Sequence, residues 1–267
     1  MKRAPSRVRM ACTAALLLGA AAAQAQPAPA INPLLVKPVG QVTADEVQFM
    51  QQRLSDWAEL GRYRAANAQL PARQAGVPRV LFYGDSITQG WGEEDAAAFF
   101  PGKGYLNRGI GGQTTAQLLL RFSQDVIALK PDVVVILAGT NDLAGNTGPS
   151  TQAMIEDNLH AMVDLAKVHG IAVVLASVLP VSDYPWMPGT QPAPKVRALN
   201  AALKDYAGVQ ELVYLDYYTP MANAAGGLDP ALAADGVHPT AKGYALMSPL
   251  AEAAIARALK GRPSDAR

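Results

Sequence analysis

The sequence predicts an α/β protein, a three-layer α/β/α sandwich around a central parallel sheet. Two observations support this prediction. Short apolar runs alternate along the chain with longer segments whose apolar residues recur at helical spacing. The run at 133–137 is continuously apolar and mostly β-branched, which is typical of a strand covered on both faces. Apolar residues make up 50% of the 267-residue chain, enough for one sizeable core, and no internal repeat interrupts the pattern.

The first 25 residues predict a secretory signal peptide that is removed from the mature chain. A basic start is followed by small and apolar residues over 11–23 and by Ala23-Gln24-Ala25, which suits signal cleavage. The apolar run is shorter than the roughly 20 residues that span a bilayer, so no stable membrane anchor is expected. Cys12 lies at the start of this run rather than after it, which argues against a lipid anchor. We therefore expect a periplasmic or secreted protein.

Charge and cysteine content exclude several classes of function. Losing the four basic residues of the signal from the 23 in the chain leaves 19 against 22 acidic residues, a net charge of −3. No basic patch remains to indicate nucleic-acid binding. The only cysteine leaves with the signal, so neither disulfides nor thiolate chemistry is expected. The three histidines show no paired metal-ligand spacing, so no metal or cofactor is expected.

The mature chain is predicted to have a leader with one helix, at 26–77, followed by a single domain at 78–262. After a proline- and alanine-rich stretch, Thr43-Ala44-Asp45-Glu46 matches a capping box that opens a helix over about 44–68. Its apolar stripe consists of Val47, Met50, Leu54, Trp57 and Leu60. Trp57 is interpreted as a packing residue rather than a ligand platform.

Five strands and four further helices are expected in the domain. The strands are placed at 80–83, 105–107, 133–137, 171–178 and 212–216. The helices are placed at about 115–129, 155–166, 196–206 and 240–259, and Pro249 is expected to kink or divide the last one. This alternation is typical of a parallel sheet with helices on both faces.

Polar residues that suit catalysis gather where the predicted strands end. They lie in the loops at 84–88, 107–114 and 139–142, and in a segment before the last helix at 235–240. Open parallel sheets build their sites at the carboxyl edge, so these four segments can converge there.

Ser86 follows the first strand and is the candidate nucleophile, which requires a base and oxyanion donors. Asp235 and His238, three residues apart, can face the same point, with the acid orienting the ring and the ring taking the serine proton. The N–H groups of Ser86 and Gly112 and the side-chain amide of Asn141 would form a three-donor oxyanion hole. Asp85 and Asp142 are expected to brace their loops.

These four segments resemble the SGNH (GDSL-type) hydrolase family, whose blocks centre on serine, glycine, asparagine and histidine. The matching residues are Gly84-Asp85-Ser86, the loop at 109–114, Gly139 to Asp142, and Asp235 with His238. The order agrees over about 78–260. The resemblance implies a flavodoxin-like fold with five parallel strands and an esterase in which Ser86, Asp235 and His238 form the triad and Ser86, Gly112 and Asn141 the oxyanion hole.

Two other classes fit the residues less well. An α/β-hydrolase requires Gly-x-Ser-x-Gly, but Thr88 stands where the second glycine belongs. A nucleotide-binding loop would require a third glycine where Thr114 stands. A non-catalytic glycan-binding relative of the family stays open as an alternative.

The substrate is predicted less directly. Trp91, Arg108, Tyr184 and Trp186 are candidates for substrate contact, with packing or loop bracing as the other interpretation of each. No long apolar channel is evident in the sequence. We therefore expect short acyl esters, with an acetylated carbohydrate as the favoured substrate and a lysophospholipase or thioesterase as the alternative.

Overall fold

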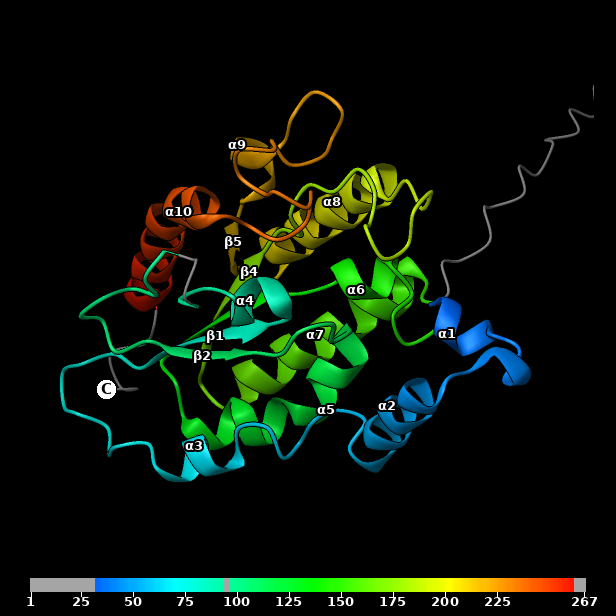
Figure 1. Ribbon diagram of the computed structural model, residues 1–267. Helices are drawn as coiled ribbons and strands as arrows, with labels where there is room; N and C mark the ends of the chain where they lie inside the picture. The colour runs from blue at the N-terminus through cyan, green and yellow to red at the C-terminus, as the bar shows by residue number, and fades with distance from the viewer. Residues whose placement is uncertain (1–31, 94–96, 262–267) are drawn as a thin grey trace, which may run out of the picture.

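The computed structural model describes residues 32–93 and 97–261 and shows the predicted sandwich (Figure 1). Its sheet has five parallel strands in the order β2-β1-β3-β4-β5. The strands are β1 (Val80–Gly84), β2 (Leu106–Gly109), β3 (Val133–Leu137), β4 (Ala172–Ala176) and β5 (Val213–Leu215). The α/β class and the five-stranded parallel sheet are confirmed. The predicted signal peptide at 1–25 and its cleavage site lie outside the described residues.

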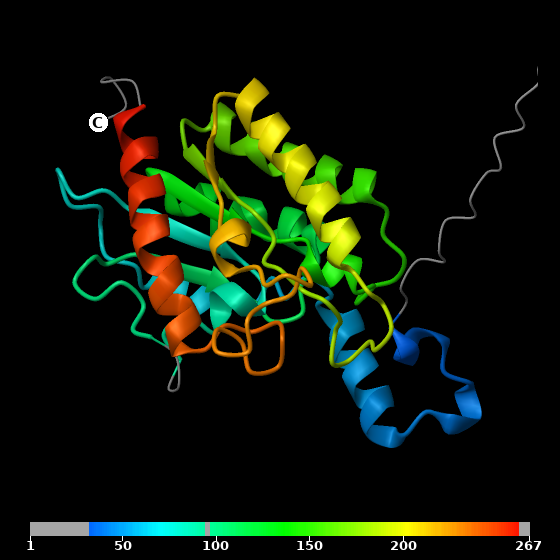
Figure 2. The same cartoon turned by 90° about the horizontal axis from the view of Figure 1, so that it is seen from above.

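Helices cover both faces of the sheet. Those of the domain are α4 (Ser86–Gln89), α5 (Thr115–Asp125), α6 (Thr140–Leu143), α7 (Gln152–Val168), α8 (Ala193–Val209), α9 (Tyr218–Met221) and α10 (Ala241–Lys260), with a 3₁₀ turn η2 (Ile127–Leu129) after α5. The view from above shows α10 in red on one side of the sheet and α8 in yellow on the other (Figure 2). None of the described helices is long and apolar enough to cross a bilayer.

Alternate residues of each strand pack into two separate cores. On one face, Leu81 and Tyr83 of β1 and Val134 and Ile136 of β3 pack against α5, α7 and α8. On the other face, strand residues between these pack against α10 and the aromatic residues that follow α4. All five residues of β1 and of β3 are buried, as expected for central strands of a covered parallel sheet.

The last helix is not divided at Pro249. The predicted division does not occur, because α10 runs without interruption from Ala241 to Lys260. Buried residues before and after the proline, including Met247 and Ala251, keep both halves of the helix on the sheet. This packing offsets the backbone hydrogen bond that the proline cannot donate.

Before the sheet, the chain forms α1 (Pro33–Val36), a 3₁₀ turn η1 (Val39–Gln41), α2 (Ala44–Ser55) and α3 (Arg64–Ala68). The capping box of Thr43 and Glu46 is present. The single helix predicted over 44–68 is wrong, because the chain turns at Asp56, whose carboxylate accepts the N–H groups of Leu60 and Gly61, both at 2.8 Å. A short acidic side chain that bonds nearby backbone competes with the helix.

Three glutamines bind this N-terminal segment to the domain. The side-chain amides of Gln117, Gln113 and Gln124 donate to the backbone carbonyls of Trp57 (2.6 Å), Ala58 (2.8 Å) and Leu60 (2.6 Å), respectively. Gln117 and Gln124 are two turns apart on α5 and therefore share one face of that helix. Figure 1 shows α2 and α3 beside α5 as a result.

Within the domain, a buried ion pair on α5 joins the ends of β1 and β2 to the loop at 109–114. Arg121 and Asp125 of α5 have fully buried side chains and lie 3.2 Å apart. The Arg121 guanidinium also donates to the carbonyls of Gly84 (3.1 Å) and Arg108 (2.9 Å) and to Oε1 of Gln113 (2.6 Å). It therefore ties the ends of β1 and β2 to the loop that carries the glycine block.

Replacing this arginine tests how much the fold depends on it. Arg121→Met should lower the free energy of unfolding by about 3–5 kcal/mol, because Asp125 would remain buried without its cation. The matched control is Lys103→Met, which removes the exposed partner of Glu252 at 3.5 Å and should cost no more than about 1 kcal/mol. Urea unfolding measures both. Equal midpoints for wild type and Arg121→Met would show that the network adds nothing to stability.

Candidate active site

Ser86 stands at the point where β1 ends and α4 begins. Asp85 is the N-cap of α4, and its Oδ1 accepts the Ile87 N–H at 3.0 Å. The preceding Gly84 passes so close to β3 that a Cβ there would lie 2.3 Å from the Leu137 carbonyl oxygen. Only glycine allows this approach, which brings the serine to the carboxyl edge of the sheet.

Ser86, His238 and Asp235 form a continuous hydrogen-bonded chain. Ser86 Oγ lies 2.9 Å from His238 Nε2, and His238 Nδ1 lies 2.6 Å from Asp235 Oδ2. The other carboxylate oxygen, Oδ1, accepts the backbone N–H groups of Val237 (2.9 Å) and His238 (2.7 Å). One carboxylate therefore shapes the turn and orients the ring. Partial burial acts to raise the pKa of Asp235, but these hydrogen bonds outweigh it and hold that pKa below its usual value.

Three residues with an available N–H donor line the cavity: Ser86 itself, Gly112 and Asn141. Ser86, as the first residue of α4, has a backbone N–H that the helix does not use. Gly112 has φ +75°, and no described group accepts its N–H, whereas the N–H of Gly111 donates to Gln89 Oε1 at 2.7 Å. Gly112 rather than Gly111 is therefore the available donor, as the sequence analysis assigned it. The third donor is the amide of Asn141, one N–H of which is used by the Gln113 carbonyl at 3.0 Å.

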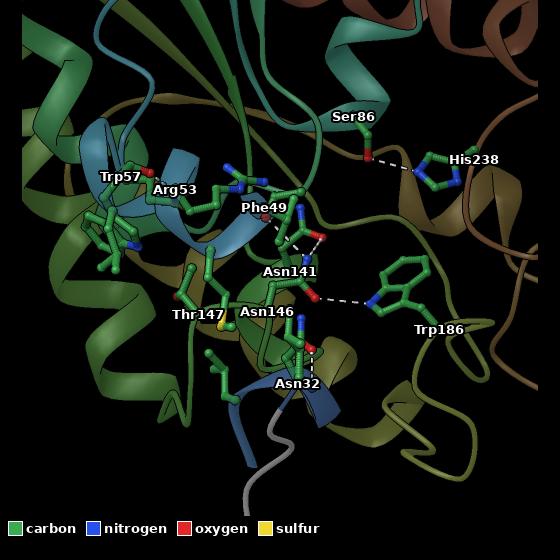
Figure 3. A pocket seen from close by; sticks show the side chains of 16 residues that line it. Asn32, Phe49, Arg53, Trp57, Ser86, Asn141, Asn146, Thr147, Trp186 and His238 are labelled. Carbon is green, nitrogen blue, oxygen red and sulfur yellow. Dashed lines mark hydrogen bonds between the residues drawn. The ribbon is translucent and has the colours of Figure 1, made fainter. Parts of the chain in front are cut away.

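Asn146 orients the amide of Asn141, a role that the sequence analysis missed. Its Nδ2 donates to Asn141 Oδ1 at 2.8 Å and to the Gly112 carbonyl at 3.2 Å (Figure 3). Its own Oδ1 accepts the indole N–H of Trp186 at 3.1 Å. The bond to Asn141 Oδ1 therefore fixes which way the Asn141 amide is turned. Only its position five residues after Asn141 could have drawn attention to Asn146.

These groups open into a cavity of about 530 Å³ with a largely apolar lining. Ser86, Gly112, Asn141 and His238 line it, and so do residues of the N-terminal segment. The segment contributes Asn32, Leu34, Leu35, Phe49, Met50, Arg53, Leu54 and Trp57. The sequence analysis did not anticipate this apolar lining beside Ser86. Trp57 lines the cavity and is 38% exposed rather than packed in a core.

The comparisons with known proteins agree with this geometry. Residues 82–246, more than half of the chain, match the GDSL-like Lipase/Acylhydrolase family. The chain belongs to this family. The predicted SGNH (GDSL-type) membership is thereby confirmed, and it supports hydrolase activity on acyl esters in general.

Individual relatives cover different shares of the chain. The crystal structure of a GDSL-like lipase from Bacteroides thetaiotaomicron is 43% identical, with a TM-score of 0.72, over 76% of this chain and 100% of that one. Esterase TesA of Pseudomonas aeruginosa is 25% identical over 182 residues, which are 64% of this chain and 84% of TesA. The uncharacterized lipoprotein YqeF of Bacillus subtilis is 40% identical over 82 residues, 29% of this chain and 33% of that protein.

Of the four candidates for substrate contact, the structure places one in the lining of the cavity. Trp186 lines the cavity, with its ring centroid 6.1 Å from that of His238. Trp91 and Arg108 do not reach it: Trp91 is 3% exposed and packs among aromatic rings, and Arg108 donates to Asn67 and stacks on Tyr63. Both are therefore corrected to packing and bracing residues.

Tyr184 is also buried away from the cavity. Its hydroxyl donates to the Thr140 carbonyl at 2.9 Å and its ring packs against Trp186. Tyr184 therefore packs against Trp186 and is not one of the residues that line the cavity.

Two buried carboxyls brace the site as expected. Asp142 accepts the N–H and hydroxyl of Thr115, tying α6 to the start of α5, and burial raises its pKa to about 6. Burial also raises the pKa of Asp85 to about 7, and its Oδ2 has no hydrogen-bond partner among the described residues. In the described part of the chain, no cluster of three or more His, Cys, Asp or Glu side chains could hold a metal ion.

Asp85→Asn should reduce the loss of stability between about pH 4 and 7. The pKa of Asp85 is about 7 in the folded protein against an ordinary 3.8, so across this range the folded state keeps a proton that the unfolded chain has lost. The free energy of unfolding therefore falls as pH rises, by on the order of 4 kcal/mol from this group. Asparagine keeps the oxygen that caps Ile87 but does not titrate.

The measurement is urea unfolding of both proteins at several pH values. The variant should retain the smaller fall that Asp142 produces up to about pH 6. Parallel curves for wild type and variant would contradict the assignment.

Proposed function

We propose that this chain is an exported serine esterase that hydrolyses carboxylic esters by two-step acyl transfer. The single observation that carries the proposal is the hydrogen-bonded chain from Ser86 through His238 to Asp235, which opens on a cavity beside three unused N–H donors. Membership of an acylhydrolase family supports the same reaction class.

In the first step, Ser86 Oγ attacks the ester carbonyl while His238 Nε2 takes its proton. The 2.9 Å separation of these atoms suits direct transfer. Asp235 holds the ring by Nδ1 and stabilises the imidazolium that forms, without itself becoming protonated.

The developing oxyanion is stabilised by the N–H groups of Ser86 and Gly112 and by the amide of Asn141. These donors are in place before reaction, because a helix start, a positive-φ glycine and the Asn146 hydrogen bond fix them. Donors that need no reorganisation stabilise the transition state most effectively.

His238 then returns the proton to the leaving alcohol oxygen, and water releases the acyl group in the second step. The alcohol must therefore lie on the His238 side of the cavity, next to Trp186. An exposed indole beside the leaving group suits an apolar or sugar face, so a carbohydrate alcohol, as expected from the sequence, remains our prediction for this side.

Two acyl groups are candidates. The sequence favours a short one, such as acetyl, on a carbohydrate. The apolar cavity favours a longer one, as in a lysophospholipase or thioesterase. Relative activity on p-nitrophenyl acetate, butyrate and octanoate discriminates between these substrates, and a non-catalytic glycan-binding relative would hydrolyse none of them.

The proposal includes export of the protein, either to the periplasm or out of the cell. The basic and apolar start of the chain supports it, and so does the similarity of an 82-residue stretch to a Bacillus subtilis lipoprotein.

Ser86→Ala should lower kcat on p-nitrophenyl esters by a factor on the order of 10⁴ to 10⁶, because no other group would attack the carbonyl. His238→Ala should fall into the same range. The readout is steady-state hydrolysis by purified mature protein, with circular dichroism to establish folding. Full activity in either variant would rule out the serine mechanism.

Asn141→Ala should lower kcat by roughly 10² to 10³ through the loss of one oxyanion donor. Asn146→Ala should have a smaller effect in the same direction, because it frees the Asn141 amide to rotate without removing it. Single-turnover rates on a slow substrate measure both. Wild-type rates in Asn141→Ala would show that two donors are sufficient.

A further inference from the structure

One wall of the active-site cavity comes from a part of the chain that lies outside the family match at 82–246. Residues of this wall fall within 32–57, in α1, in α2 and just after it. Its apolar members are Leu34, Leu35, Phe49, Met50, Leu54 and Trp57. We call this set the N-terminal wall.

Helical spacing directs the wall toward the cavity. Met50 and Leu54 are four residues apart and share one side of α2, and Trp57 follows in the turn after the helix; all three line the cavity. No residue of α2 is buried, and Leu54 is 81% exposed. An apolar helix face that contributes nothing to a core but lines the cavity beside Ser86 is suited to contact a ligand there.

The wall is anchored at both ends. At one end the backbone N–H of Asn32 donates to the Gly145 carbonyl at 3.0 Å. At the other, Gln117 and Gln113 donate to the carbonyls of Trp57 and Ala58. The position of the wall relative to Gly145 and Gln113 is therefore fixed by hydrogen bonds close to the oxyanion donors Asn141 and Gly112.

The charge within the wall is neutralised. Arg53, which lines the cavity, pairs with Glu59 at 2.7 Å, and its guanidinium carbon lies 5.4 Å from the centroid of the Phe49 ring. The surface offered to a ligand is therefore mainly apolar.

The position of the base decides which half of an ester meets this wall. His238 and Trp186 lie on one side of Asn141, whereas Arg53 and Trp57 lie on the other (Figure 3). The leaving alcohol must lie next to His238, which gives it a proton, so the acyl group extends past Gly112 and Asn141 in the opposite direction. That direction leads to the N-terminal wall.

We propose that the N-terminal wall is the acyl-binding surface of this enzyme and that it selects apolar acyl chains longer than acetyl. This inference rests on the proposed serine esterase function. Each methylene buried against such a surface strengthens binding in the transition state, so kcat/KM should rise from acetate to octanoate.

The test is the ratio of kcat/KM for p-nitrophenyl octanoate to that for p-nitrophenyl acetate. The wild-type ratio should exceed one. Met50→Trp fills the space and should lower the ratio by about tenfold or more. Leu54→Ala, at an exposed position that cannot disturb a core, should lower it several-fold.

The matched control is Gln48→Trp, which places the same bulk at an exposed residue on the other side of α2 that does not line the cavity. It should leave the ratio at the wild-type value. A wild-type preference for acetate, or equal ratios in Met50→Trp and Gln48→Trp, would overturn the acyl-binding role and leave the esterase intact. If wild type were no faster than Ser86→Ala on either ester, the esterase assignment itself would fail.

Discussion

The buried guanidinium of Arg121 is the constraint on which the site depends. It donates to the carbonyls of Gly84 and Arg108, which lie near the carboxyl ends of β1 and β2. It also donates to the side chain of Gln113 in the loop at 109–114. Its charge is balanced by Asp125 and faces the ring of Tyr83 at 4.3 Å. A buried cation is tolerated only where its donors are satisfied, so the backbone around it has little freedom. The proposed nucleophile Ser86 and the loop that carries Gly112 are thereby fixed relative to each other.

Much of this arrangement was accessible from the sequence. A continuous apolar and mostly β-branched run such as 133–137 predicts a buried strand. The order and spacing of Ser86, Asn141 and His238 single them out as candidate site residues. Arg121 was not accessible, because an arginine within an amphipathic helix pattern looks the same whether it faces water or a buried carboxylate. The prediction that Trp91 contacts substrate is wrong for a similar reason, because the sequence around an aromatic residue after such a loop does not show whether its ring is buried or exposed.

The N-terminal wall shows the same limit of periodicity. The spacing of Met50, Leu54 and Trp57 predicts an apolar stripe on a helix, and the sequence analysis interprets Trp57 as a packing residue. Helical spacing shows that one side of a helix is apolar, but it does not show what that side meets. The turn at Asp56 ends α2, and the side chains of Met50 and Leu54 line the cavity.

The N-terminal wall is held to the domain through its backbone, so its position does not depend on which side chains it carries. Gln113, Gln117 and Gln124 bind backbone carbonyls at 57, 58 and 60 rather than side chains. Every residue has a backbone carbonyl, so the side chains of the wall can change without loosening these three bonds. The proposed nucleophile and oxyanion donors lie at the sheet edge, where Arg121, Asn146 and Asp142 hold the loops that carry them. The proposed chemistry and the proposed acyl-binding surface therefore lie in different parts of the chain, so we expect acyl preference to change without substitution of a residue that reacts.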